Sequence, residues 1–499
     1  MRKSLPIISS GSSAKLSSEG SCSASHTSNS IKGSTETSSS IHVEATKYRG
    51  NAAIVTLGCA KNQVDSEIML GALKHQGFEI VTDPALAEVI VVNTCGFLES
   101  SVRESLDAIL EAASYKEEGR LRRLIVAGCM VERYKTDLKH TLPEVDAFLT
   151  TNDLLEAGKA GLGHFSTELE SAARPYFLYD ERMPRVRSTA RHSAYVKISE
   201  GCNRPCTFCV IPAIRGSMRS RPYQSILDEV RYLVDDGVQE VVLVGQDLTA
   251  YGSDSSQGKN SAVDIINLLE GLNEIEGLNW IRLLYAYPLG INERLIRAIV
   301  ELPKVCNYLD IPLQHSSEAV LKRMKRPLGK YSPRALVRSM REWSSDALTI
   351  RTTFIVGFPG ETEADVCDLI DFVGEGHFTN VGVFKYSKEE GTESYNLDCH
   401  VSEGEKGRRL SRVMKAQQRV VAGHSQKLIG SVIPVLVEGS HEESNLILVG
   451  RAEFQAPEVD GKIIINDAPP NEVITAGKFF PVMITEVLGY DYVGRIVRS

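Results

Sequence analysis

The sequence contains no apolar run of roughly 20 residues, the length that a helix needs to cross a bilayer, so we expect a soluble protein without membrane contact. Cysteine is also scarce, at 10 of 499 residues, and no secretory apolar segment follows Met1. These absences predict a cytoplasmic protein without a disulfide scaffold, whose reduced thiols can bind metal. The chain has no excess of positive charge, because its formal net charge is -8. This balance makes stable nucleic-acid binding unlikely and is compatible with a basic protein partner.

The first 49 residues have few large apolar side chains and no regular periodicity. Sixteen serines lie between Ser4 and Ser40, and such a composition cannot bury enough surface to offset the entropy lost on ordering. We therefore predict that residues 1–49 form a disordered Ser-rich leader, and we assign no role to Cys22. An organelle transit peptide is the alternative, because the segment contains basic residues, but its glutamates disfavour that interpretation.

Three cysteines lie close together in the stretch EGCNRPCTFCV, at Cys202, Cys206 and Cys209. Their C-x3-C-x2-C spacing lets one short loop turn three thiolates toward one centre. A structural zinc site normally takes four protein ligands, whereas a four-iron cluster held by three thiolates keeps one iron open. The spacing therefore favours an iron-sulfur cluster with an open coordination site.

Three further cysteines each follow a predicted strand near the start of the chain. The strands are residues 52–57, 88–93 and 124–127, and the cysteines are Cys59, Cys95 and Cys129. Helical patterns separate the strands, which predicts an open parallel α/β domain over residues 50–165 whose ligands bind at the carboxyl edge. We therefore expect these thiols to meet at a shared metal centre. The alternative is three unrelated buried thiols, because cysteine is often buried.

After a stretch from residue 154 to 187 that resembles a linker, six strand and helix signals alternate over residues 188–425. The predicted strands are residues 194–199, 240–244, 280–284, 308–311, 349–356 and 381–386. Six β/α repeats predict a partial parallel barrel with the three-cysteine loop after its first strand. Loops that follow the strands line the mouth of such a barrel. A lone His315 in one of these loops is more typical of a structural histidine than of a catalyst.

The last part of the chain changes to short strands after a charged helical stretch at residues 403–427. Five short strand signals predict a small all-β, OB-like barrel over residues 427–496. Barrels of this kind often bind nucleic acid, but residues 426–499 contain ten acidic and six basic residues. A barrel that grips phosphates should be basic, so this one is better suited to a basic protein.

The cysteine loop, with Phe208 before its last cysteine and a strand before its first, resembles that of radical S-adenosylmethionine (SAM) enzymes. The resemblance implies a 4Fe-4S cluster whose open iron binds SAM and a reductive cleavage that yields a 5′-deoxyadenosyl radical. Loops at the barrel mouth would then contact SAM, and we select Phe208, Gln246, Gly357 and Glu361 as cofactor-binding candidates. A structural metal loop or an electron-transfer cluster is the alternative.

From about residue 51 to the end, the arrangement of both cysteine sets and the terminal barrel is similar to the methylthiotransferase family. That family has an amino-terminal methylthiotransferase domain, a radical SAM core and a TRAM domain. The resemblance implies two 4Fe-4S clusters, the second held by Cys59, Cys95 and Cys129 and carrying the sulfur to be inserted. It also implies that one SAM donates the methyl group and another generates the radical, which requires an electron donor such as flavodoxin or ferredoxin.

Within the family, several stretches are most similar to the RimO-type branch, which modifies an aspartate of a ribosomal protein. They are LGCAKN at 57–62, VNTCGF at 92–97, KISEGC at 197–202, DIPLQH at 310–315, TFIVGFPGE at 353–361 and APEVDG at 456–461. The resemblance implies methylthiolation of the β-carbon of an aspartate in small-subunit ribosomal protein twelve, a basic partner that suits the acidic barrel. A transfer-RNA adenosine methylthiotransferase and a non-catalytic iron-sulfur or zinc binding module are the alternatives.

Overall fold

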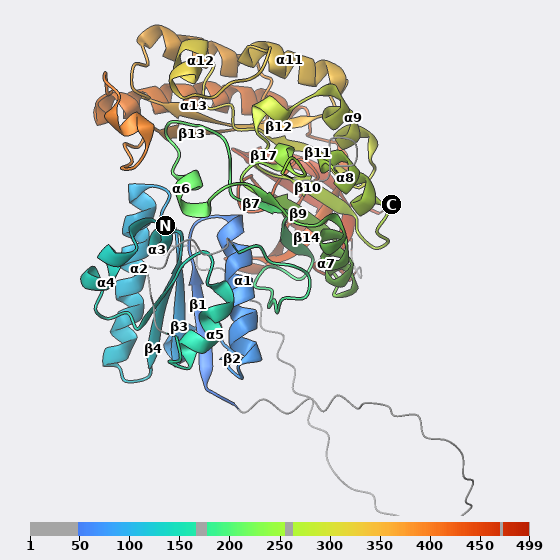
Figure 1. The fold of residues 1–499 in the computed structure, drawn as a ribbon. Coiled ribbons are helices and arrows are strands. Elements are labelled where there is room, and N and C mark those ends of the chain that lie inside the picture. The colour runs from blue at the N-terminus through green and yellow to red at the C-terminus, as the bar shows by residue number, and fades with distance from the viewer. Residues whose placement is uncertain (1–47, 166–176, 255–262, 470–472, 499) are drawn as a thin grey trace, which may run out of the picture.

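A computed structural model describes residues 48–165, 177–254, 263–469 and 473–498 (Figure 1). The predicted disordered leader, apart from residues 48 and 49, and Cys22 within it lie outside these ranges. In this part of the chain, no helix has both the length and the apolar character that crossing a membrane demands.

The amino-terminal domain is a five-stranded parallel sheet with the strand order β2-β1-β3-β4-β5. Its strands are β1 (Asn51–Thr56), β2 (Glu79–Ile80), β3 (Val89–Thr94), β4 (Arg123–Gly128) and β5 (Ala147–Leu149). Every residue of β3 is buried, which explains its continuous apolar sequence at the centre of the sheet. Alternate residues point to opposite faces, so Val89 and Val91 pack on the α1 side and Ile90 and Val92 on the α2 side.

Five α-helices surround this sheet. They are α1 (Ala60–His75), α2 (Glu99–Glu117), α3 (Cys129–Tyr134), α4 (Thr136–Thr141) and α5 (Ala157–Gly161). The prediction of a linker from residue 154 was wrong over its first residues, which form the 3-10 turn η2 (Leu154–Glu156) and α5. Leu154, Ala157 and Ala160 belong to the same apolar cluster as α1. Small residues gave this segment too weak a periodicity to be recognised.

The central domain is a six-stranded parallel sheet with the order β13-β12-β11-β10-β9-β6. Its strands are β6 (Ser193–Lys197), β9 (Glu240–Val244), β10 (Trp280–Leu283), β11 (Val305–Asp310), β12 (Thr349–Val356) and β13 (Asn380–Lys385). The helices between them are α7 (Tyr223–Asp235), α8 (Ile265–Asn273), α9 (Glu293–Glu301), α10 (Glu318–Arg323), α11 (Pro333–Trp343) and α12 (Glu363–Gly374). The edge strands β6 and β13 do not pair, so the predicted partial β/α barrel is confirmed.

Three short elements follow β6 and carry the cysteine loop. They are β7 (Ser199–Glu200), α6 (Ile211–Arg215) and β8 (Arg219–Ser220), and β7 pairs antiparallel with β8. In Figure 1, α6 lies between the amino-terminal sheet and the core. Val210 and Ile214 pack there against Cys129, with Phe97 beside them. The cysteine loop therefore belongs to the contact between the two α/β domains.

The long helix α13 (Glu403–Gln426) leads into a closed five-stranded barrel with the order β14-β15-β16-β18-β17, which confirms the predicted small β-barrel. Its strands are β14 (Val432–His441), β15 (Ser444–Arg451), β16 (Ile463–Asp467), β17 (Phe479–Leu488) and β18 (Asp491–Ile496). Valine and isoleucine side chains of these strands fill its interior. The three-part α/β, β/α-barrel and all-β organisation is thus as the sequence predicted.

Part of the segment between β15 and β16 packs against the core. The Asp460 carboxylate accepts a 2.7 Å hydrogen bond from the Tyr308 hydroxyl and lies 3.2 Å from Arg351 Nε, while Ala456 is fully buried. The stretch APEVDG, which belongs to the family resemblance, therefore joins the barrel to the inner face of the core sheet.

Glu240 at the start of β9 holds a second part of this junction. Its Oε1 lies 2.8 Å from Arg282 Nε, and its Oε2 lies 2.5 Å from Nη2 of Arg451 in the barrel. Burial alone would raise the pKa of Glu240, but Arg451 and Arg282 lower it from 4.5 to about 2. A carboxyl whose pKa is lower in the folded state stabilises it above pH 4.5, and this contribution disappears as the pH falls toward 2.

We therefore expect Glu240→Gln to reduce the free energy of unfolding by about 3 kcal/mol at pH 7, because it leaves the buried Arg282 guanidinium without its carboxylate and Arg451 with Glu438 alone. The difference from the unchanged protein should shrink as the pH falls from 4.5 toward 2. Urea unfolding followed by Trp280 fluorescence in a Trp343→Phe background measures it, because Trp280 packs 4.8 Å from Phe479 of the barrel. Glu443→Gln, at an exposed barrel position, is the control, and an equal loss in both variants would contradict the prediction.

Candidate active site

The loop that carries Cys202, Cys206 and Cys209 is fixed by backbone hydrogen bonds. Cys202 N donates to Gly216 O at 3.0 Å, and Cys209 N donates to Cys206 O at 3.2 Å. Gly201 has φ +82°, and a Cβ there would lie 2.2 Å from Ser217 O, so only glycine fits. One tight segment thus carries all three thiols, and their convergence on one cluster stays a prediction.

Positively charged side chains surround the middle cysteine of this loop. Arg326 Nη1 lies 3.4 Å from Cys206 Sγ, and the Tyr287 hydroxyl lies 3.9 Å from it. Arg204 and Arg326 both place their guanidinium groups over the Tyr287 ring, at 4.4 and 4.3 Å from its centroid. Burial raises the pKa of the Cys209 thiol to about 12. A thiolate in this loop therefore needs a strong positive partner, which cluster iron provides.

The amino-terminal cysteines lie where the sequence predicted, at the carboxyl edge of the first sheet. Cys59 directly precedes α1, Cys95 follows β3, and Cys129 is the first residue of α3 after β4. Their loops are in close contact, because a Cβ on Gly58 would lie 3.2 Å from Cys95 Sγ and one on Gly96 would lie 2.8 Å from Cys129 O. The three cysteines thus come from three strands into one region.

The thiols of this second set differ in exposure, since Cys59 is exposed, Cys95 is half-buried and Cys129 is buried. Burial raises the pKa of Cys129 to about 12, although Arg215 acts to lower it. Within the described ranges, no group of three or more histidine, cysteine, aspartate or glutamate side chains is placed to hold a single metal ion. In a four-iron cluster each thiolate binds a different iron, so neither cysteine set has to converge on one point.

Arg215 at the end of α6 joins the two cysteine sets. Its Nη2 donates to Cys129 Sγ at 3.1 Å and to Asn62 Oδ1 at 2.5 Å, while its Nη1 lies 3.4 Å from Glu200 Oε2. Glu200 immediately precedes the three-cysteine loop of the core, and its Oε1 accepts a 2.7 Å hydrogen bond from Gln246 Nε2. A continuous path of hydrogen bonds therefore runs from Cys129 to the mouth of the core.

Two more charged residues complete this buried network. Asp65 on α1 accepts a 2.7 Å hydrogen bond from Arg215 Nη1 and forms an ion pair with Lys197, which also lies 2.7 Å from Glu200. Burial alone would raise the pKa of Glu200, but Lys197 and Arg215 lower it to about 2. Glu200 therefore remains ionised, and its charge is balanced by cations from the core while Asp65 supplies a carboxylate from the amino-terminal domain.

Several buried polar atoms at the carboxyl ends of the core strands have no hydrogen-bond partner in the described residues. They are Ser199 Oγ, Gln246 Oε1, Gln314 Oε1, His315 Nε2 and Arg326 Nε. Unpartnered polar atoms in such a position are expected where a polar ligand binds. Donors and acceptors are both present, which fits the amino, carboxylate and hydroxyl groups of SAM.

Two of the candidate cofactor contacts lie in the turn after β12. Glu361 accepts hydrogen bonds from Gly357 N at 2.7 Å and from Arg409 Nη1 at 2.9 Å, through its two different carboxylate oxygens. Gly357 has φ +74°, and a Cβ there would lie 2.3 Å from Lys406 Cγ. The predicted contact of this turn with SAM remains untested, and the carboxylate of Glu361 already stabilises the turn itself.

Phe208, another candidate cofactor contact, and His315 pack against this turn. Phe208 contacts Phe358 edge-to-face, with ring centroids 6.4 Å apart. His315 accepts a 2.9 Å hydrogen bond at Nδ1 from Ser317 N, and its Nε2 lies 3.6 Å from Glu361 Oε2. The bond to Ser317 agrees with the structural role that we expected for this histidine.

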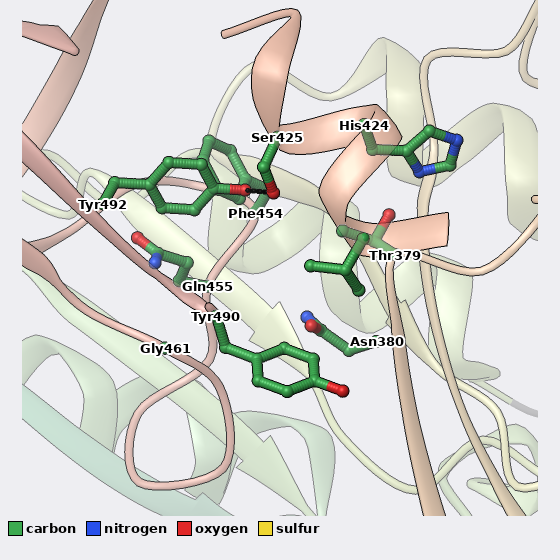
Figure 2. A pocket seen from close by; sticks show the side chains of 10 residues that line it. Thr379, Asn380, His424, Ser425, Phe454, Gln455, Gly461, Tyr490 and Tyr492 are labelled. Atoms are coloured by element: carbon green, nitrogen blue, oxygen red, sulfur yellow. Dashed lines mark hydrogen bonds between the residues drawn. The ribbon is translucent and has the colours of Figure 1, made fainter. Parts of the chain in front are cut away.

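A separate cavity lies away from both cysteine sets, where α13 and the terminal barrel meet (Figure 2). Its volume is about 20 Å³, and Figure 2 shows Ser425 and Tyr492 joined across it by a 3.1 Å hydrogen bond. Gln455 Nε2 is buried beside it and has no hydrogen-bond partner in the described part of the chain. The space suits one bridging water. Because it lies where α13 and the terminal barrel meet, this cavity belongs to the junction of the domains and not to the active site.

The comparisons with known families match the three parts of the structure. Residues 51–150 match the uncharacterized protein family UPF0004, residues 196–373 match the radical SAM superfamily, and residues 429–497 match the TRAM domain. The protein named ribosomal protein uS12 methylthiotransferase RimO from Syntrophotalea carbinolica is 46% identical over 451 residues, covering 89% of this chain and 96% of that protein. The chain belongs to the RimO family.

Other members of the RimO family are similarly close. The protein of the same name from Anaeromyxobacter sp. strain K is 46% identical, and the match covers 89% of this chain and 92% of that protein.

Among solved structures outside the RimO family, the radical SAM methyltransferase TsrM from Kitasatospora setae is 16% identical with a TM-score of 0.48, covering 68% of this chain and 75% of that chain. As a member of the RimO family, this chain is a radical SAM methylthiotransferase, and SAM and an iron-sulfur cluster are its cofactors.

Sequence analysis missed the residues that connect the two cysteine sets. Arg215, Lys197 and Asp65 lie in three different elements, and no local spacing relates them. Lys61 lies in the stretch LGCAKN of the family resemblance, and its Nζ lies 3.4 Å from the centroid of the Tyr285 ring in the core. Burial alone would lower the pKa of Lys61, but Tyr285 and Cys59 raise it above its ordinary value. All four residues lie within helices or strands, so the strand-end loops carried no signal for them.

Arg215→Gln should reduce the free energy of unfolding by about 3–5 kcal/mol, because it removes one member of a fully buried ionic network. Anaerobic urea unfolding of the purified chain measures the change. Arg103→Gln is the matched control, since both side chains of the Arg103–Glu99 pair are 75% exposed and its loss should change stability by no more than about 0.5 kcal/mol. Similar midpoints for Arg215→Gln and the control would show that the network contributes little.

Proposed function

We propose that this enzyme transfers a methylthio group to the β-carbon of an aspartate in ribosomal protein uS12, using two 4Fe-4S clusters. The name of the relatives, ribosomal protein uS12 methylthiotransferase RimO, supports the protein substrate. The observation that carries the two-cluster proposal is the hydrogen-bonded path through Arg215. This path runs from Cys129 to Glu200, which precedes the three-cysteine loop of the core.

In this proposal Cys202, Cys206 and Cys209 hold one cluster, and a second is held by the strand-end cysteines Cys59, Cys95 and Cys129. When bound, the first cluster and SAM supply a radical able to remove an unactivated hydrogen, and the second supplies the sulfur. Phe208, Gln246 and the turn from Gly357 to Glu361 contact SAM. The reductant is an electron donor such as flavodoxin or ferredoxin, and the enzyme acts in the cytoplasm.

The chain's own residues prepare this site in three ways. Arg326 and Arg215 donate to the sulfurs of Cys206 and Cys129 and so stabilise their thiolate forms. Gln246 is oriented by Glu200, which leaves its Oε1 free for a ligand. Phe97, Val210 and Ile214 pack around Cys129 and exclude water from that side. We assign these roles to three domains, which span residues 50–165, 188–425 and 427–496.

The acidic terminal barrel supports a protein substrate over a transfer RNA. It carries ten acidic and six basic residues between residues 426 and 499, which is unfavourable for phosphate contacts and favourable for a basic protein. We expect cells that lack this enzyme to lose the methylthio group from uS12 while adenosine methylthiolation in transfer RNA is unchanged. Mass spectrometry of both molecules measures this, and loss from adenosine with unchanged uS12 would contradict the proposal.

The two cysteine sets should separate in their effects on SAM cleavage. After anaerobic reconstitution, Cys206→Ala should abolish formation of 5′-deoxyadenosine, whereas Cys95→Ala should keep cleavage and stop sulfur insertion. The products are measured by liquid chromatography, and iron and sulfide contents are measured on the same samples.

Cys367→Ala is the matched control, because Cys367 is exposed on α12 and outside both sets. It should leave cleavage and insertion unchanged. Equal loss of cleavage in Cys206→Ala and Cys95→Ala would refute the division of roles, and zinc binding without any cleavage would support a non-catalytic module instead.

A further inference from the structure

We propose that Lys61 binds the side-chain carboxylate of the substrate residue and so selects an aspartate. This inference rests on the proposed function, in which the acceptor is an aspartate of uS12. Lys61 is the second residue of α1 and lies two positions after Cys59. Its ammonium reaches the core, where it lies 3.4 Å from the centroid of the Tyr285 ring in the loop after β10.

Lys61 differs from the other cations between these two domains because its charge has no carboxylate partner among the described residues. Lys197 and Arg215 are both paired with Asp65 and Glu200, and Arg185 is paired with Glu67 at 2.6 Å. Lys61 is half-buried, and its ammonium lies over a ring face. An ammonium has three hydrogen-bond donors, and a ring face satisfies none of them fully, so this cation is available for an incoming anion.

Tyr285 is held in a conformation that fixes its ring over Lys61. Its φ is +71°, which is uncommon for a residue other than glycine and unfavourable for a bulky side chain. Two hydrogen bonds hold this backbone, from Tyr285 N to Asp310 Oδ2 at 3.3 Å and from Leu248 N to Tyr285 O at 3.2 Å. A strained residue that its surroundings hold in place is typical of a functional site.

The position of Lys61 suits the chemistry of an aspartate acceptor. A side-chain carboxylate is bonded directly to the β-carbon, so an ion pair with this carboxylate also places the carbon that reacts. Lys61 lies between the strand-end cysteine set, through Cys59, and the mouth of the core, through Tyr285. A neutral adenine has no anionic group to offer, so this cation also favours a protein acceptor over a base.

Lys61 could instead serve only to balance the negative charge of nearby thiolates. The two roles differ in what they discriminate, because only a substrate-binding ammonium distinguishes aspartate from asparagine in uS12. Binding of uS12 to the reconstituted enzyme without reductant measures this difference in the absence of turnover.

We expect the unchanged enzyme to bind uS12 about 10- to 100-fold more tightly than a uS12 variant with asparagine at the modified position. Lys61→Met should remove this preference and bind both forms equally weakly. Lys61→Gln keeps a neutral donor and a similar stem, and it should retain at most a small preference. Lys74→Met, at an exposed position of the same helix, should leave the preference and the iron content unchanged.

An undiminished preference for aspartate in Lys61→Met or Lys61→Gln would overturn the inference. Loss of iron from both variants, with the preference unchanged in the remaining holoenzyme, would assign Lys61 to cluster binding instead. If the unchanged enzyme neither binds nor modifies uS12, the proposed function itself is wrong, and this outcome is distinct from a failure of Lys61 alone.

Discussion

The buried ion-pair network between α1 and the core is the interaction on which the site depends. Arg215 of the core contacts a carboxylate, an amide and a thiol at once, and all three belong to the amino-terminal domain. A guanidinium can do this because its donors point in fixed directions within one plane. Its charge is balanced only when both domains are present, so the network makes the relative position of the two cysteine sets specific.

The terminal barrel has a comparable attachment to the inner face of the core sheet. Arg451 and Asp460, at the two ends of one connecting segment, pair with Glu240 and Arg351 from the core. The stretch APEVDG thereby acts first as a packing element. The acidic character that distinguishes this barrel must therefore act through its exposed surface, which includes Glu458 in the segment between β15 and β16.

The sequence predicted most of the fold because strands and helices follow from local patterns. β9 and β12 lie at the predicted residues, since apolar runs are strong there. Placement of the strand-end cysteines followed from parallel-sheet geometry. The ion pairs did not, because Cys129 and Arg215 are 86 residues apart and contacts at that separation leave no local pattern.

Helix α1 shows why the interface itself was not predictable. Asn62, Asp65 and Glu67 are buried although polar residues in a helix ordinarily predict a solvent-exposed face. Their partners are cations of another domain, so burial depends on residues more than one hundred positions away.

This split of charges between domains has a consequence for modular exchange. A chimera that replaced residues 50–165 with a domain lacking Asp65 and Glu67 would bury Lys197 without Asp65 and Arg185 without Glu67. The linear boundary between the domains is therefore not the boundary of the exchangeable unit. That unit comprises the amino-terminal domain together with the core residues that neutralise it, and a transplant would have to carry both.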